Sequence, residues 1–432
     1  FVPSRGLGDV YKRQVLEATW IQAVRAAIEL DPGFEAPHNL LAEHYRARLL
    51  ESERLGSPRA AYYETLLRTH DRGQHTEFLV GAGAISLETE PAGAAVMAAR
   101  VVQEERRLVA AEAGFLGTTP LEAVRLEHGS WILTLEAPGS PPVCYPVSLA
   151  RNAHLQALAP VRLPVALQER ECAVPAGWFD CGGDPESPDC LPARRLWVDG
   201  FVMQRDPVTV GEYLAFLNAL LDAGEEELAL RCVPTSRDVV GSARQPLAVR
   251  EGGRFASVLD VQGQVWPGKT PITLIDWHSA VAYARWLSRS TGQAWRLPNE
   301  VEWEKAARGA DGRVWPFGNH FDPVWACVAG STEQSATPRD VGVPQTDVSP
   351  YGVQGLTGNV RDWCINVWRH DGPDTREGRL LVDAAAAEDA ELRAVRGGSF
   401  ASAAHMCRAA TRFAMRPDAR YQAVGFRLVR PL

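Results

Sequence analysis

The chain has 432 residues, of which 46% are hydrophobic and 23% are charged, and its formal net charge is −8. The length predicts two or three domains, and the acidic balance without a basic block argues against a nucleic-acid-binding protein. The apolar runs are far shorter than the ~20 residues that a bilayer requires, so we expect no membrane span in this segment.

The eight cysteines include no CxxC pair, which argues against a structural zinc site. Buried free thiols are favoured. One disulfide among Cys172, Cys181 and Cys190 is the alternative, since these residues lie close together in a stretch rich in glycine and proline.

Residues 1–14 match nothing that follows in pattern. The segment FVPSRGLGDVYKRQ begins without an initiating methionine or a signal peptide. We expect it to be a non-native or artefactual segment, and the chain to be the C-terminal part of a longer protein.

Residues 15–76 predict a helical segment. Val24 and Ile28 lie on one stripe at helical spacing, Asp31-Pro32-Gly33 ends that helix, and a second apolar set includes Leu41 and Tyr45. The segment resembles a tetratricopeptide-type helical hairpin, which cannot bury its own apolar face and needs a neighbour.

In residues 77–165 apolar and polar residues alternate with a period of two, which predicts strands. ISLETEPAGAAVMAARV alternates around a turn at Glu90-Pro91-Ala92-Gly93, and LEHGSWILTLEAPG adds further strand and turn residues. This series resembles the PEGA module, a small β-sandwich, and we expect a spacer or binding module. His128, beside Gly129 at a turn, is expected to be a solvated loop residue.

Residues 166–432 are rich in tryptophan, arginine and glycine, and two helices are predicted within them. Asp276 caps a helix that ends at Gly292, and Asn299 and Glu302 have capping-box spacing before a helix that ends at Gly309. Large aromatic rings are expected to form the core where regular secondary structure is short.

Several motifs of this region occur in the order found in the formylglycine-generating enzyme (sulfatase-modifying factor) family, which the region resembles. They include RLPNEVEWEKAARG, GLTGNVRDW, RAVRGGSF and VGFRLVR. The resemblance implies an α+β fold of the C-type-lectin-like kind. The three segments together are similar to bacterial proteins that begin with a Ser/Thr kinase domain. We therefore expect an upstream kinase, a bacterial source, and the cytoplasm rather than the cell envelope as the location.

The resemblance also bears on copper. Family enzymes oxidise a cysteine of a sulfatase to formylglycine with O2 and a Cu(I) ion between two thiolates, and the two thiol positions fall on Ser402 and Cys407. A serine hydroxyl is a poor ligand for this soft ion, so copper is not expected and oxidase activity is predicted to be absent. The alternative is an active sulfatase-modifying oxidase, or a related non-haem metal oxidase, with Cys407 as its catalytic residue.

The favoured hypothesis is a ligand-binding module that reports to the kinase. The candidate ligand-binding residues are Ser399, Ser402, His405 and Arg408, and the partner is an unknown protein or peptide. Cys407 is then a buried small apolar residue. Two roles stay open for Arg408, which either forks onto an anion or holds loops together through backbone carbonyls.

The loop GLTGNVRDW is a candidate calcium site. In the family such a loop holds Ca²⁺ through backbone carbonyls and one carboxylate, which here are those of Gly358, Val360 and Asp362. Gly355 stands where an Asn or Asp is usual. The other role considered for Asp362 is to cap a turn.

Two related branches are disfavoured. An iron-dependent branch uses an HxxxH pair in its helical domain, whereas neither His38 with His44 nor His70 with His75 has the i, i+4 spacing that places two imidazoles on one helical face. The variable proteins of diversity-generating retroelements carry hypervariable residues between RGGS and GFRLV, where this chain is rich in alanine.

Overall fold

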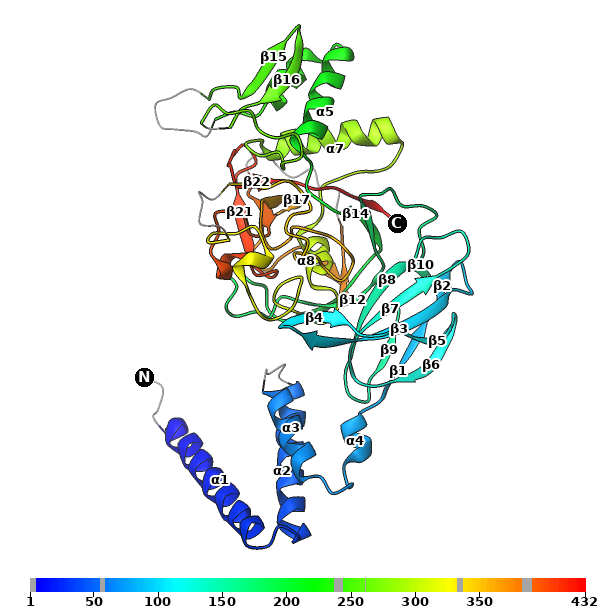
Figure 1. The fold of residues 1–432 in the computed structure, drawn as a ribbon, viewed down its shortest axis with the longest axis vertical. Helices are drawn as coiled ribbons and strands as arrows, with labels where there is room; N and C mark the ends of the chain where they lie inside the picture. Colours follow the sequence, from blue (N-terminus) through cyan, green and yellow to red (C-terminus); the bar gives the residue numbers. More distant parts are fainter. Residues whose placement is uncertain (1–4, 55–58, 237–243, 261, 332–336, 383–390) are drawn as a thin grey trace. The chain divides into compact units, whose positions relative to one another are not determined.

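The computed structural model describes residues 5–54, 59–236, 244–260, 262–331, 337–382 and 391–432 (Figure 1). By its internal contacts the chain forms two compact units. One comprises Phe1–Gly83 with two short segments, Arg125–His128 and Arg151–Ala153. The other comprises Ala84–Val124, Gly129–Ala150 and His154–Leu432.

The first unit is helical, as predicted for most of its length. The first break falls at the predicted Asp-Pro-Gly, where the backbone N–H of Gly33 donates to the Asp31 carboxylate at 3.0 Å. Its first helix continues from Arg5 through residue 14, so the boundary predicted there does not coincide with the end of an element. The helices are α1 (Arg5–Leu30), α2 (Glu35–Arg54), α3 (Ala60–His70) and α4 (Thr76–Val80).

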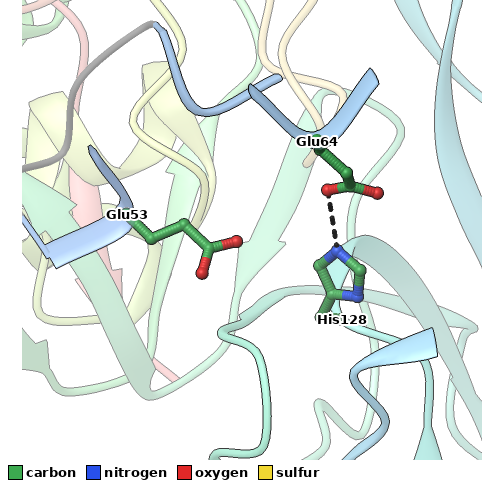
Figure 2. Close-up of side chains that lie close together, drawn as sticks. All are labelled: Glu53, Glu64 and His128. Atoms are coloured by element: carbon green, nitrogen blue, oxygen red, sulfur yellow. Dashed lines mark ion pairs between the residues drawn. The ribbon is translucent and has the colours of Figure 1, made fainter. Parts of the chain in front are cut away.

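The helices of this unit bury one apolar cluster. The predicted residues Val24, Leu41 and Tyr45 belong to it, together with Leu49, Leu67 and Leu79. At its margin, Glu53 of α2 and Glu64 of α3 point towards His128, which comes from one of the two short segments (Figure 2). The tetratricopeptide assignment stays a prediction.

Residues 83–162 form strands, as the period of two predicts. One sheet has the order β6-β1-β9, and another has the order β4-β3-β7-β8 with β5 paired to β3. Ile85 of β1 and Leu133 of β7 belong to one apolar cluster, so the two sheets share a core. The PEGA assignment stays a prediction. The strands are β1 (Gly83–Leu87), β2 (Thr89–Glu90), β3 (Ala95–Glu104), β4 (Arg107–Ala110), β5 (Gly114–Thr118), β6 (Leu121–Leu126), β7 (Gly129–Glu136), β8 (Val143–Leu149), β9 (His154–Gln156) and β10 (Val161–Arg162).

The remainder of the chain mixes helices with short strands, as an α+β fold predicts. Its sheets have the orders β11-β14-β23, β12-β13-β19-β18, β15-β16 and β21-β20-β17-β22. The helices are α5 (Val210–Asp222), α6 (Glu226–Cys232), α7 (Trp277–Thr291) and α8 (Glu300–Arg308), with 3-10 turns η1 (Pro323–Trp325) and η2 (Ala404–Cys407). The strands are β11 (Glu171–Val174), β12 (Gly177–Cys181), β13 (Arg194–Val198), β14 (Phe201–Gln204), β15 (Ala248–Glu251), β16 (Arg254–Val258), β17 (Arg361–Val367), β18 (Thr375–Arg376), β19 (Arg379–Leu380), β20 (Arg393–Arg396), β21 (Arg412–Met415), β22 (Val424–Gly425) and β23 (Val429–Pro431).

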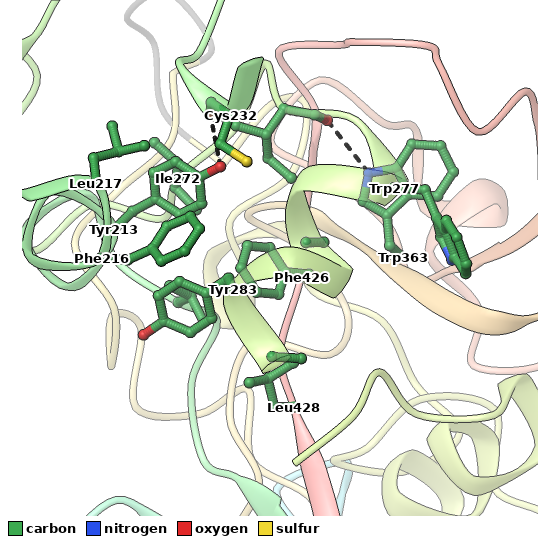
Figure 3. Packing of buried hydrophobic residues seen from close by; sticks show 14 of the residues in the cluster. Tyr213, Phe216, Leu217, Cys232, Ile272, Trp277, Tyr283, Trp363, Phe426 and Leu428 are labelled. Carbon is green, nitrogen blue, oxygen red and sulfur yellow. Dashed lines mark hydrogen bonds between the residues drawn. The ribbon is translucent and has the colours of Figure 1, made fainter. Parts of the chain in front are cut away.

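Aromatic side chains fill the core beside α5 and α7, as predicted. Tyr213 and Phe216 of α5 pack against Tyr283 of α7, and Tyr213 and Tyr283 pack against Phe426 (Figure 3). The indole of Trp277 donates to the Cys364 carbonyl at 2.9 Å, so the polar atom of this buried ring is satisfied.

Both predicted helix caps are confirmed. The Asp276 carboxylate accepts from the Ser279 backbone at 2.8 Å, and Gly292 ends α7 in the left-handed conformation with a φ of 70°. Asn299 and Glu302 form the reciprocal capping box of α8, and Gly309 follows its last residue.

Helix α8 is buried along its whole length, including its charged side chains. Glu300 accepts from Arg412 at 2.6 Å, and Glu304 accepts from Arg396 and from Arg308, each at 2.7 Å. Lys305 donates to backbone carbonyls at 2.6 to 3.3 Å. Because buried charges need partners, these contacts tie α8 firmly to the strands and loops around it.

None of the helices in the described ranges combines the length and hydropathy that crossing a bilayer requires.

Candidate functional site

The candidate ligand-binding and thiol residues lie on one loop, residues 397–411, between β20 and β21. Arg396 at the end of β20 donates to Glu304 and to the Ala409 carbonyl within the loop, at 2.7 and 2.8 Å. Arg412 at the start of β21 pairs with Glu300. Both ends of the loop are therefore fixed to α8.

Ser402, at the first thiol position of the family, is a buried residue whose hydroxyl has several partners. It accepts from the Ser399 backbone N–H at 3.1 Å, and the two serine hydroxyls lie 2.7 Å apart. Arg361 Nη2 donates to the same oxygen at 2.9 Å. The loop thus brings Ser399 and Ser402 together, and β17 supplies the guanidinium.

Cys407 is fully buried at the end of η2. Its Sγ lies 3.4 Å from the Ala403 carbonyl, and it packs in an apolar cluster with Trp315 and Phe317. Burial raises the pKa of Cys407 to about 12, so the group is a thiol at neutral pH. All eight cysteines are free thiols, so the alternative of a disulfide among Cys172, Cys181 and Cys190 is wrong.

These residues do not fit a copper ion between two thiolates. One position carries a thiol whose ionisation is disfavoured, and the other carries a hydroxyl that already accepts from Ser399 and Arg361. Cu(I) prefers two soft sulfur ligands, and this pair offers one.

His405 and Arg408 are placed differently from the two serines. The His405 side chain is exposed. Arg408 forks onto Asp184 at 2.6 and 2.8 Å and also pairs with Glu186 at 2.9 Å. Burial would raise the pKa of Asp184, but its hydrogen bond from Arg408 lowers it below the ordinary value. The anion that Arg408 holds is therefore a carboxylate of its own chain.

The candidate calcium loop already holds a cation of the protein. Asp362 Oδ2 accepts from Trp303 Nε1 at 2.8 Å and from Arg427 Nε at 2.7 Å, and Arg427 Nη2 also donates to the Gly355 carbonyl. Gly358 and Val360 are buried beside this pair. A calcium ion here would lie next to a buried guanidinium, so the ligand set fits Ca²⁺ poorly, and calcium stays a prediction.

A group of possible metal ligands lies in the helical unit, where Glu53, Glu64 and His128 converge (Figure 2). Arg151 Nη2 lies 3.1 Å from Glu53 Oε1 and 3.0 Å from both Glu64 Oε2 and His128 Nε2. The guanidinium thus takes the place that a metal cation would need. The hydrogen bond from His128, with those of the arginines, lowers the pKa of Glu64 to about 2.

His128 lies in the loop between β6 and β7, as predicted, but it is mostly buried rather than solvated. Its side chain is 16% exposed, and its main partner Glu64 is far away in the sequence. A second contact missed in the sequence joins His38 and His70, whose Nδ1 atoms lie 3.1 Å apart across α2 and α3. Spacing within one helix carries no information about such pairs between helices.

Comparison with known proteins places the chain in a family. Residues 159–432, more than half of the chain, match the Sulfatase-modifying factor enzyme 1-like domain. The chain belongs to this family. The match begins shortly before the boundary predicted at residue 166.

Relatives within the sulfatase-modifying factor family include both active and inactive proteins. The formylglycine-generating enzyme of Thermomonospora curvata is 28% identical over 62% of this chain and 95% of its own length. The inactive C-alpha-formylglycine-generating enzyme 2 of Bos taurus is 28% identical over 59% of this chain and 85% of its own length. The serine/threonine-protein kinase Pkn1 of Chlamydia trachomatis is 26% identical over 59% of this chain but only 37% of the kinase. Family membership therefore does not decide activity.

Proposed function

We propose that this chain is a ligand-binding member of its family without cysteine-oxidase activity. The observation that carries the proposal is Ser402, whose hydroxyl stands at the first thiol position and accepts hydrogen bonds from Ser399 and Arg361. The remaining thiol, Cys407, is buried and protonated at neutral pH. One neutral thiol and one engaged hydroxyl give Cu(I) little to bind.

The proposed setting is the sensory part of a bacterial kinase-linked protein. The similarity to Pkn1, which covers 37% of that kinase, supports this setting, as do the helical and strand segments that precede the family domain. The tetratricopeptide-like and PEGA-like segments would be the other modules of that protein. A protein or peptide is the proposed ligand, and the cytoplasm is the proposed location.

A copper titration tests the missing oxidase site. The unmodified chain, Ser402→Cys, and Ser402→Cys combined with Cys407→Ser are titrated with Cu(I) under anaerobic, reducing conditions against a chromophoric competitor. We expect one tightly bound ion in Ser402→Cys, because two sulfur ligands are then available, and none in the other two proteins. Cys407→Ser is titrated in the same way, and stoichiometric uptake by the unmodified chain that disappears in this variant would overturn the proposal.

The second candidate function is an active oxidase that uses Cys407. The observation that favours it is the similarity to the Thermomonospora curvata enzyme across 95% of that enzyme. Incubation of the copper-treated chain with O2 and a cysteine peptide of sulfatase type decides between the two. Formylglycine detected by mass spectrometry would establish the oxidase, and unchanged peptide supports the binding module.

A further inference from the structure

Arg361 differs from the other partly or fully buried arginines around the loop. It begins β17, donates through Nη2 to Ser402 at 2.9 Å, and lies over the Phe413 ring at 4.2 Å. Its Nε is buried and has no hydrogen-bond partner, which is also true of Arg396 Nε, so the missing carboxylate is what distinguishes Arg361. Within the described ranges of the chain, no carboxylate forms an ion pair with Arg361.

The neighbouring arginines show what Arg361 lacks. Arg396, Arg408, Arg412 and Arg427 each lie 2.6 to 2.7 Å from a carboxylate oxygen. A charge removed from water is stable only when it is paired and hydrogen-bonded.

The groups next to Arg361 are suited to an anion. A planar guanidinium with an unpartnered N–H matches a group with two or more oxygens. The Ser399 and Ser402 hydroxyls lie 2.7 Å apart, so one donates to the other and the second proton is left to donate to the anion. Phe400, between these two serines in the chain, lines a cavity of about 100 Å³ together with Thr337 and Gln422. Phe400 joins this cavity to the receptor residues along the chain, but Arg361, Ser399 and Ser402 do not line it themselves.

We propose that Arg361, Ser399 and Ser402 form a receptor for an oxyanion group, a carboxylate or a phosphate, carried by the ligand. The receptor stands where copper-binding members of the family have their thiol pair. The inference rests on the proposed binding function and adds the chemical class of the group that is recognised.

Anion titration of the whole chain tests the receptor. Inorganic phosphate and acetate are added at constant ionic strength, with chloride as the reference, and binding is followed by calorimetry and by the melting temperature. We expect saturable binding of at least one oxyanion. Binding of phosphate would indicate a phosphate group on the ligand, and binding of acetate would indicate a carboxylate. Binding should weaken at least tenfold in Arg361→Gln and severalfold in Ser402→Ala. Arg416→Gln is the matched control, because Arg416 is exposed and pairs with Asp418, and it should bind like the unmodified chain.

Two outcomes overturn the receptor: no saturable binding of either oxyanion, or unchanged binding in Arg361→Gln. If Arg361→Gln does not fold, Arg361→Lys replaces it. Arg361→Lys keeps the positive charge but cannot form the paired hydrogen bonds of a guanidinium. If its oxyanion affinity falls less than that of Ser402→Ala, the proposal is contradicted. Failure of this inference is distinguishable from failure of the proposed function. If the unmodified chain binds neither oxyanion nor Cu(I), only the receptor proposal is contradicted. If it takes up stoichiometric Cu(I), both the receptor and the proposed function are contradicted.

Discussion

Asp347 is a buried carboxyl group that holds the loop before β17. It accepts from the Thr357 hydroxyl at 2.8 Å and from the Thr357 backbone N–H at 3.1 and 3.2 Å. Burial raises the pKa of Asp347 from an ordinary 3.8 to about 6, because these hydrogen bonds compensate only part of the lost hydration.

This raised pKa predicts a stability that depends on pH. The folded chain holds the Asp347 proton more tightly than the unfolded chain, so protonation favours folding. The extra stability is complete below about pH 4 and is lost as the pH rises through 6, a change on the order of 3 kcal/mol. Asp347→Asn keeps an acceptor for Thr357 but cannot ionise, so its free energy of unfolding should lack this step.

Urea unfolding between pH 4 and 8 measures the difference between variant and unmodified chain. Asp371→Asn is the control, because the Asp371 side chain is fully exposed. The same pH profile in Asp347→Asn and in the unmodified chain would show that Asp347 is not the group responsible.

Part of the candidate site was predictable from the sequence. The RGGSF motif located Ser402 and Cys407, because the family pattern fixes their positions. It could not reveal that Arg361, which is distant in the sequence, donates to the Ser402 hydroxyl. The role left open for Arg408 depended in the same way on Asp184, which lies at the opposite end of the domain sequence.

At the scale of elements, the charged side chains of α8 hold the C-terminal domain together. Glu304 is 1% exposed and accepts from Arg396, from Arg308 and from the backbone of Gly182. Burial would raise the pKa of Glu304, but Arg396 and Arg308 lower it below its ordinary value. The ionised carboxylate therefore neutralises two buried guanidinium groups.

Neutralising Glu304 should destabilise the domain strongly. Glu304→Gln leaves Arg396 and Arg308 without their shared counter-charge, and we expect the free energy of unfolding to fall by about 3 to 5 kcal/mol. Glu226→Gln removes the partner of Arg250 from a glutamate that is 58% exposed, and should change stability by less than about 1 kcal/mol. Denaturant unfolding compares the two variants, and equal losses would contradict a special role for α8.

The caps of α7 and α8 were predictable because a cap depends on residues within one turn of the helix. The burial of α8 was not. The sequence EVEWEKAAR has the composition of a surface helix, and its arginine partners Arg396 and Arg412 follow far along the chain. Local patterns place helix ends well, whereas the exposure of charged residues depends on distant partners.

At the scale of the whole molecule, the two units have separate apolar cores. The helical unit buries Leu41, Leu49 and Leu67 in a cluster of its own. Arg151 is the central charge of that unit, since its side chain is 3% exposed and pairs with Glu53 and Glu64. Local periodicity predicted the helical and strand regions, but it gave no sign that residues 125–128 and 151–153 belong with the helices.

Replacing Arg151 should affect one unit only. We expect two calorimetric transitions, one for each unit. Arg151→Gln should lower the free energy of unfolding of the helical unit by about 2 kcal/mol, because two carboxylates lose their partner. The melting temperature of that unit, followed by its helical signal, should fall by roughly 10 °C. Arg162→Gln, which breaks an exposed pair with Glu90, should leave both transitions in place. A single transition that shifts as a whole in Arg151→Gln would contradict two independent units.

The anchoring of residues 397–411 at both ends has a consequence for how this scaffold evolves. Arg396 and Arg412 fix where the segment enters and leaves, and neither depends on what residue 402 carries. A change at residue 402 therefore leaves both anchors of the segment in place, although it alters the hydrogen bonds to Ser399 and Arg361. Libraries that vary the exposed positions of this segment, such as His405, should therefore yield mostly well-folded proteins, whereas the buried Cys407 and Ala409 should tolerate few replacements.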